Sequence, residues 1–159
     1  GTYNVAAPLS PPASAPSLAV YGGFAGTETT PADRAPTGNE TILDGGGTGR
    51  VVAMPPLAMA DTVIDGFTIT NGSADKGGGV YCPTYTSPTI SHNRITGNAA
   101  GLGAAVCCED YSWPTISNNV ITANATAAPP AMAIRSNLAC ATNGFTARRA
   151  TAETRSTVA

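Results

Sequence analysis

The stretch PTISHNRITGN at residues 88–98 recurs as PTISNNVITAN at residues 114–124, and these two copies decide the fold. One period earlier, residues 62–72 read TVIDGFTITNG and keep both isoleucines and the second threonine in register. A second stretch repeats with the same period, as GGGVYC at residues 77–82 and GAAVCC at residues 103–108. The sequence therefore contains a repeated unit, and a fixed period of about 26 residues is typical of solenoid folds.

Within the unit, strand-forming residues alternate with turn-forming residues. Ile, Val and Thr favour a pleated sheet, whereas Gly, Asn, Pro and Ser interrupt it. The apolar positions do not follow the spacing of an amphipathic helix. Residues 62–124 contain a single leucine, Leu102, which argues against a leucine-rich repeat. We therefore predict an all-β chain that forms a parallel β-helix, a solenoid of about four rungs of about 26 residues.

Stacked rungs place equivalent residues above one another as ladders. Two interior ladders are expected, one of Ile64, Ile90 and Ile116, and one of Ile69, Ile95 and Ile121. Asn93 and Asn119 form a polar ladder where the chain bends, because asparagine tolerates the left-handed backbone that bends often need and its amide can bond to its copies.

Two of the four cysteines also share a position. Cys82 and Cys108 lie one period apart, so a disulfide between rungs is geometrically allowed. The alternative is a pair of buried thiols that act as small apolar side chains. The neighbouring Cys107 is expected to point outward, and Cys140 lies outside the repeat.

The organisation of the chain follows from where the repeat holds. Residues 1–40 are predicted to form a partial rung with Pro-rich loops, and residues 41–126 the β-helix repeats. Residues 127–159 are an off-pattern tail that contains Ala and Arg. The tail is compatible with a helical cap, with a disordered end, or with a segment foreign to the repeat. We expect it to be irregular or disordered.

Composition excludes several classes of protein. Charged residues make up 11% of the chain, and hydrophobic residues make up 42%, too many for a disordered linker. The formal net charge of −2 argues against a nucleic-acid partner, which requires a basic surface. No apolar run reaches the roughly 18 residues that a membrane span needs.

The ionisable residues offer little for catalysis. His92 shares its position with Gly66 and Asn118, which indicates a permissive surface or turn position. The repeat places His92, Asp65 and Arg94 in one neighbourhood, without a second partner for any of them. No set of carboxylates in register suggests calcium, and no CxxC motif suggests zinc. We expect no catalytic residue, no metal and no cofactor, so a non-enzyme is favoured while an enzyme stays open.

An aromatic strip is the best candidate for a ligand contact. Tyr85 and Tyr111 share one position, and Trp113 follows two residues later. Such rings can stack on sugars while their polar atoms form hydrogen bonds, and Glu109 and Asp110 lie close enough to accept from a sugar hydroxyl. The alternative is that the rings simply cover the end of a strand.

The motif PTIS-x-N-x-IT-x-N, followed by a Gly-rich VYC strand, resembles the right-handed parallel β-helix repeats of the pectin-lyase-like superfamily. The resemblance covers about residues 18–126 and is closest to repeat blocks of large secreted and surface-anchored bacterial proteins. VYGGFAGTET at residues 20–29 and TILDGG at residues 41–46 resemble the segments that precede such repeats. The resemblance implies a right-handed coil, an extracellular or cell-surface location, and further rungs of the same parent protein as partners.

The function that the resemblance implies is open, because this superfamily contains enzymes, adhesins and passive stalks. We expect a non-catalytic structural or adhesive β-helix segment of a larger secreted or cell-surface bacterial protein. The alternatives are a carbohydrate-binding module whose partner is a polysaccharide or a cell-surface glycan, and a polysaccharide lyase or hydrolase.

Overall fold

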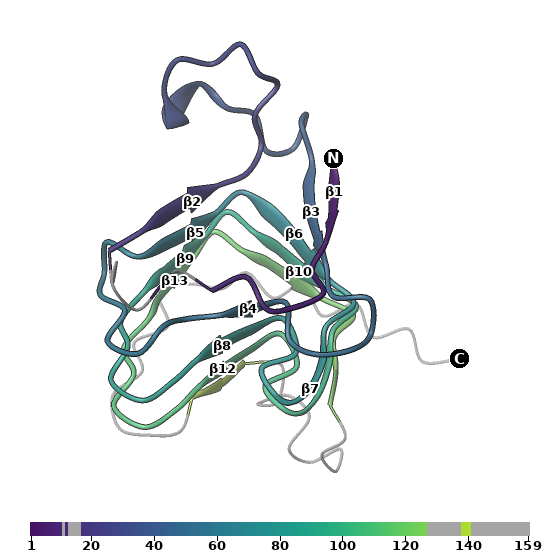
Figure 1. Cartoon of the computed structure of the whole chain (residues 1–159), viewed down its shortest axis with the longest axis vertical. Coiled ribbons are helices and arrows are strands. Elements are labelled where there is room, and N and C mark those ends of the chain that lie inside the picture. Colours follow the sequence, from purple (N-terminus) through teal and green to yellow (C-terminus); the bar gives the residue numbers. More distant parts are fainter. Residues whose placement is uncertain (11, 13–16, 127–137, 141–159) are drawn as a thin grey trace.

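The computed structural model describes residues 1–10, 12, 17–126 and, for the backbone alone, 138–140 (Figure 1). Short strands and one 3-10 turn make up its regular structure. Their bounds in chain order are β1 (Thr2–Asn4), β2 (Ala19–Tyr21), η1 (Pro31–Asp33), β3 (Thr41–Asp44), β4 (Val52–Ala53), β5 (Val63–Asp65), β6 (Phe67–Thr70), β7 (Ser73–Lys76), β8 (Val80–Cys82), β9 (Thr89–Ser91), β10 (Arg94–Thr96), β11 (Ala99–Leu102), β12 (Val106–Cys108), β13 (Thr115–Ser117), β14 (Val120–Thr122), β15 (Ala125–Thr126) and β16 (Leu138–Cys140). Within the described residues, no helix has the length and apolar character needed to cross a bilayer.

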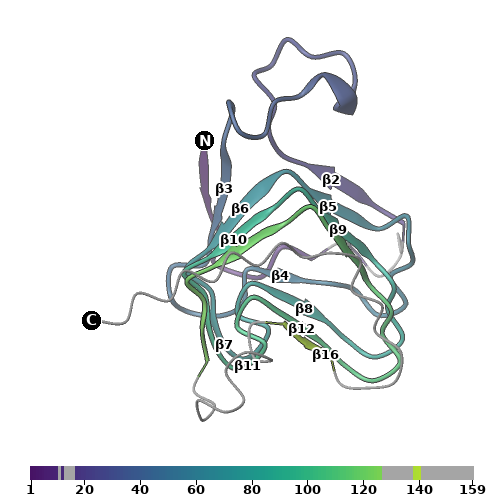
Figure 2. The same ribbon diagram turned by 180° about the vertical axis from the view of Figure 1, so that it is seen from behind.

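The strands form four parallel sheets. Their orders are β1-β3-β6-β10-β14, β2-β5-β9-β13, β4-β8-β12-β16 and β7-β11-β15. Strands that follow one another in the chain belong to different sheets, so the chain winds around an enclosed interior (Figures 1 and 2). The predicted parallel β-solenoid is confirmed, with about three complete turns, and β13–β15 begin a fourth.

The period of the repeat sets the register between turns. Ile64 pairs with Ile90, and Ile90 with Ile116; the second ladder joins Ile69 to Ile95 and Ile121 in the same way. The first two isoleucines of each ladder are fully buried, while Ile116 and Ile121 are half-buried against the core. Burying one such side chain stabilises a fold by about 1.5–3 kcal/mol, so these ladders are a large part of the core.

Asn93 and Asn119 form a ladder at the start of β10 and β14. Both side chains are buried. The Oδ1 atom of Asn93 accepts from the Phe67 N–H at 3.0 Å, and that of Asn119 accepts from the Asn93 N–H at 2.8 Å. Their amide groups donate to the carbonyl oxygens of Ile64 and Ile90 in the preceding turn, at 2.9 and 2.8 Å. The ladder therefore satisfies the buried backbone on both sides of each bend.

A second asparagine ladder lies at the other end of the same strands. Asn98 accepts from the Gly72 N–H at 2.9 Å, and Asn124 from the Asn98 N–H at 3.0 Å. Their amide groups donate to the carbonyl oxygens of Ile69 and Ile95. The sheet that contains β6, β10 and β14 is thus fastened at both ends by side-chain amides.

The residues with a left-handed backbone conformation are not those of the asparagine ladders. Left-handed backbone at Asn93 and Asn119 was the expectation, and it is wrong, because the residues before them, His92 and Asn118, have φ of 52° and 55°. Each turn has further left-handed corners at equivalent positions. The four sets are Gly66, His92 and Asn118; Asn71, Gly97 and Ala123; Gly77 and Gly103; Tyr85 and Tyr111.

One corner of the first turn holds a long excursion. β2 pairs with β5, and β3 pairs with β6. Between β5 and β6 stands only Gly66, whereas residues 22–40 stand between β2 and β3. This excursion, which contains η1, projects beyond the strands at the top of Figure 1. The first turn therefore begins at β2, before the boundary at residue 41 that the repeat alone indicated.

The cysteines and the tail depart from parts of the expectation. Cys82 and Cys108 are paired in register and buried, and no disulfide joins these two residues. Cys107 is buried at 1% exposure, although alternation predicted that it would face outward. In the tail, β16 continues the sheet beyond β12 with Cys140 opposite Cys108, at a spacing longer than the period of the repeat. The rest of the predicted irregular tail lies outside the described residues.

Candidate functional site

Tyr85, Tyr111 and Trp113 form what we call the aromatic ledge. The two tyrosine rings are stacked, with centroids 5.1 Å apart and ring planes 10° from parallel. Tyr85 is 59% exposed, Tyr111 61% and Trp113 53%. Part of each ring is thus open to solvent, which a ligand contact requires.

The stacking limits how the ledge can contact a ligand. Adjacent rungs lie about 4.8 Å apart, and this spacing suits offset-stacked rings. Each tyrosine covers one face of the other. A sugar can therefore reach the ring edges, the outer face of a tyrosine, or the indole of Trp113.

Glu109 does not stand open beside the ledge. Its carboxylate accepts from Lys76 Nζ at 2.8 Å and from the Tyr81 hydroxyl at 3.2 Å. The hydrogen bond from Lys76 holds the pKa of Glu109 below its ordinary value. The guanidinium of Arg50 lies 4.3 Å from the centre of the Tyr81 ring and completes the group. Glu109, which was expected to contact a sugar hydroxyl, is bound within this cluster. Asp110 lies next to the ledge, because its backbone carbonyl accepts from the Tyr85 N–H at 3.4 Å.

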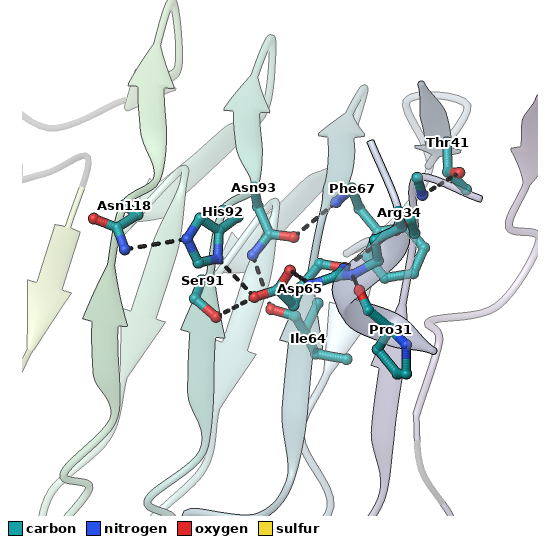
Figure 3. A network of polar contacts seen from close by, with 12 residues as sticks. Pro31, Arg34, Thr41, Ile64, Asp65, Phe67, Ser91, His92, Asn93 and Asn118 are labelled. Atoms are coloured by element: carbon teal, nitrogen blue, oxygen red, sulfur yellow. Dashed lines mark hydrogen bonds and ion pairs between the residues drawn. The ribbon is translucent and has the colours of Figure 1, made fainter. Parts of the chain in front are cut away.

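A second polar group centres on Asp65, which is 5% exposed (Figure 3). Arg34 Nη2 donates to its Oδ1 at 2.5 Å. The Ser91 hydroxyl and His92 Nδ1 donate to its Oδ2 at 2.5 and 2.8 Å. Burial by itself raises the pKa of Asp65, but these hydrogen bonds and the charge of Arg34 outweigh it and lower that pKa. Asp65 is therefore a buried, ionised carboxylate with three donors.

Arg34 ties the excursion of residues 22–40 to the solenoid. Besides Asp65, its guanidinium donates to the backbone carbonyls of Pro31 at 2.6 Å and Gly22 at 3.2 Å. It also lies 4.6 Å from the centre of the Tyr21 ring. All these contacts hold one side chain in one geometry, so the excursion is fixed over the turn that follows it.

His92 links this group to the next turn. Because the ionised Asp65 carboxylate only accepts, Nδ1 of His92 carries the hydrogen in their bond. The other nitrogen, Nε2, lies 3.2 Å from the amide nitrogen of Asn118. The His92 side chain is 55% exposed, so Nε2 is within reach of a ligand. The sequence analysis expected no second partner for His92, Asp65 or Arg94. This is wrong for Asp65, which also binds Arg34, and for His92, which also contacts Asn118.

A cleft of about 650 Å³ lies where the excursion faces β6, β10 and β14. Its lining residues are Pro31, Ala32, Arg34, Pro36, Thr37, Glu40, Gly66, Phe67, Thr68, His92, Asn93, Arg94, Asn118 and Val120. Its charged groups come from both sides of the cleft: Arg34 and Glu40 from the excursion, and Arg94 from β10. Among the described residues, no ion pair of Arg94 is formed.

The part of the chain that the structure describes holds no group of three or more His, Cys, Asp or Glu side chains arranged to bind a metal. Comparison with known proteins adds a family. The family described as "Protein of unknown function (DUF1565)" matches residues 18–157. No curated protein matches the chain, and no solved structure matches it.

Proposed function

Because the chain belongs to the DUF1565 family, whose description assigns no function, we propose from its own surface that it is a non-catalytic, adhesive β-solenoid segment of a larger secreted or cell-surface bacterial protein. The proposal includes kinship with the pectin-lyase-like superfamily and further rungs of the same parent protein as neighbours. A glycan is the proposed partner, contacted through the aromatic ledge.

The exposure of the aromatic ledge carries this proposal. All three rings are more than half exposed on neighbouring turns of a rigid coil. Tyr and Trp are enriched at interfaces and dominate their energetics, so exposed rings on adjacent turns favour a binding surface. Their apolar faces and polar atoms suit the alternating C–H and hydroxyl groups of a sugar.

The state of two paired carboxylates supports a non-catalytic role. Asp65 and Glu109 are both paired with cations, and in both the pKa is lowered. A general acid near neutral pH needs the opposite, a carboxyl group whose pKa is raised. Both groups have a structural use, because Asp65 holds Arg34 and Glu109 holds Lys76.

The test is glycan-array binding by the whole chain and two variants. We expect the double variant Tyr111→Ala, Trp113→Ala to lose at least about tenfold in affinity, which corresponds to about 1.4 kcal/mol. Tyr3→Ala is the matched control, because Tyr3 is 61% exposed but lies on β1.

Other outcomes would redirect the assignment. Equal glycan binding by the wild type and the double variant would overturn the role of the ledge. A wild type that binds no glycan would leave a purely structural segment as the function. Turnover of a uronate polymer that a chelator abolishes would instead identify a lyase and refute the non-catalytic proposal.

A further inference from the structure

The cleft beneath the excursion has no part in the proposed function, and it is preformed. One wall is held by Arg34, whose guanidinium is bound by Asp65 and by two carbonyl groups. The other wall is the sheet that the asparagine ladders fasten. The volume of about 650 Å³ lies within the range of small-ligand sites, roughly 300–1,000 Å³.

The polar groups in the cleft are arranged in register on adjacent turns. Thr68, Arg94 and Val120 are paired residues of β6, β10 and β14, so they form one column. Arg94 is exposed and has no ion pair within the described part of the chain. Glu40 accepts from the Thr68 hydroxyl at 2.7 Å, which places a carboxylate one turn from the guanidinium.

We propose that this cleft binds a small hydroxylated carboxylate such as a sugar acid. Arg94 is the counter-ion, because a guanidinium binds a carboxylate through two parallel hydrogen bonds. Glu40 accepts from a hydroxyl and repels a second carboxylate. The ligand therefore carries one acidic group with hydroxyl groups beside it.

His92 and Asn118 supply the remaining polar contacts. The Asn118 amide donates to Nε2 of His92, which therefore accepts. The two groups together match a hydroxyl group, which both donates and accepts. The bond between them, 3.2 Å long and exposed, is one that a ligand hydroxyl can replace. Val120, half exposed beside Arg94, gives the C–H face of the ligand an apolar surface.

Isothermal titration calorimetry of the whole chain tests the proposal with D-glucuronate, D-glucose and acetate as probes. Glucuronate carries both the carboxylate and the hydroxyls, whereas each of the others lacks one of them. We expect glucuronate to bind at least about tenfold more tightly than either, and added salt to weaken it. Methyl glucuronide separates a free sugar acid from an acidic residue of a glycan: retained binding indicates a glycan residue, and lost binding indicates the free acid.

Variants locate the binding in the cleft. Arg94→Ala is expected to reduce glucuronate affinity at least about tenfold, and Arg94→Lys to retain part of it. His92→Gly removes Nε2 while keeping a residue that the equivalent corner, Gly66, already uses. Tyr111→Ala, on the aromatic ledge, should leave the affinity for glucuronate unchanged. The experiment therefore distinguishes failure of the proposed glycan contact at the ledge from failure of the proposed site in the cleft. Equal affinity for glucuronate and glucose, equal affinity for glucuronate and acetate, or an unaffected Arg94→Ala would each overturn the site.

Discussion

Replacing Asn93 with alanine tests whether the asparagine ladders hold the turns together. The side chain of Asn93 is 2% exposed and bridges two turns. Its Oδ1 atom accepts from the Phe67 N–H, and its amide group donates to the Ile64 carbonyl and to Oδ1 of Asn119. Alanine removes all of these bonds and leaves the backbone groups where water does not reach them.

The magnitude follows from counting what is stranded. A buried polar group left without a partner costs about 1–3 kcal/mol. Asn93→Ala strands the Phe67 N–H and removes the side-chain donor of the Ile64 carbonyl. Asn119 keeps only the backbone N–H of residue 93 as a donor. We expect a loss of about 3 kcal/mol in the free energy of unfolding, a large fraction of the roughly 5–15 kcal/mol of an ordinary domain.

Urea unfolding followed by circular dichroism measures this loss. The control is Asn4→Ala, which removes an exposed amide on β1. A difference of less than about 1 kcal/mol between Asn93→Ala and the wild type would refute the reasoning, because the ladder would then be dispensable.

Three further predictions concern Asp65, the excursion, and the separate corner that contains Ala123. The pKa of Asp65 is lowered in the folded state, so its contribution to stability is present above about pH 4 and is lost as the pH falls through the folded-state pKa; thermal melts should show Asp65→Asn less stable than the wild type at pH 7 and less sensitive to acid. Arg34→Ala should speed limited proteolysis within residues 22–40, with Arg34→Lys intermediate; unchanged cleavage would mean that the excursion needs no anchor. Ala123→Gly should raise the free energy of unfolding by up to about 1 kcal/mol in urea, because Ala123 has a left-handed φ of 53°, and a loss of stability would contradict this.

The periodic part of the fold could be predicted from the sequence because the register between turns equals the period. Ile64, Ile90 and Ile116 follow one another at intervals of one period and are therefore neighbours in space. The same arithmetic brought Tyr85 and Tyr111 together as a stacked pair. The period of a repeat predicts which residues distant in sequence are neighbours in space, and a sequence without repeats offers no such prediction.

Contacts made by non-repeated segments could not be found in this way. Arg34 lies in the excursion, and nothing in the period relates it to Asp65. β16 pairs with β12 at a spacing longer than the period, which hides it from a search for exact repeats. Cys107 is buried although the alternation of a strand points it outward, because alternation does not show which outer faces other side chains cover. The cleft beneath the excursion was missed because the excursion is not part of the repeat.

At the corner that precedes β6, β10 and β14, the number of residues can change while the geometry of the coil stays the same. In one turn this corner contains residues 22–40, and in the next it contains Gly66 alone. β3 and β6 nevertheless pair without a shift in register. An engineer can therefore graft a loop of unrelated sequence at position 92 or 118 while leaving the interior ladders untouched. Natural selection has the same freedom, so members of such a lineage can diversify their recognition loops one turn at a time without redesigning the scaffold.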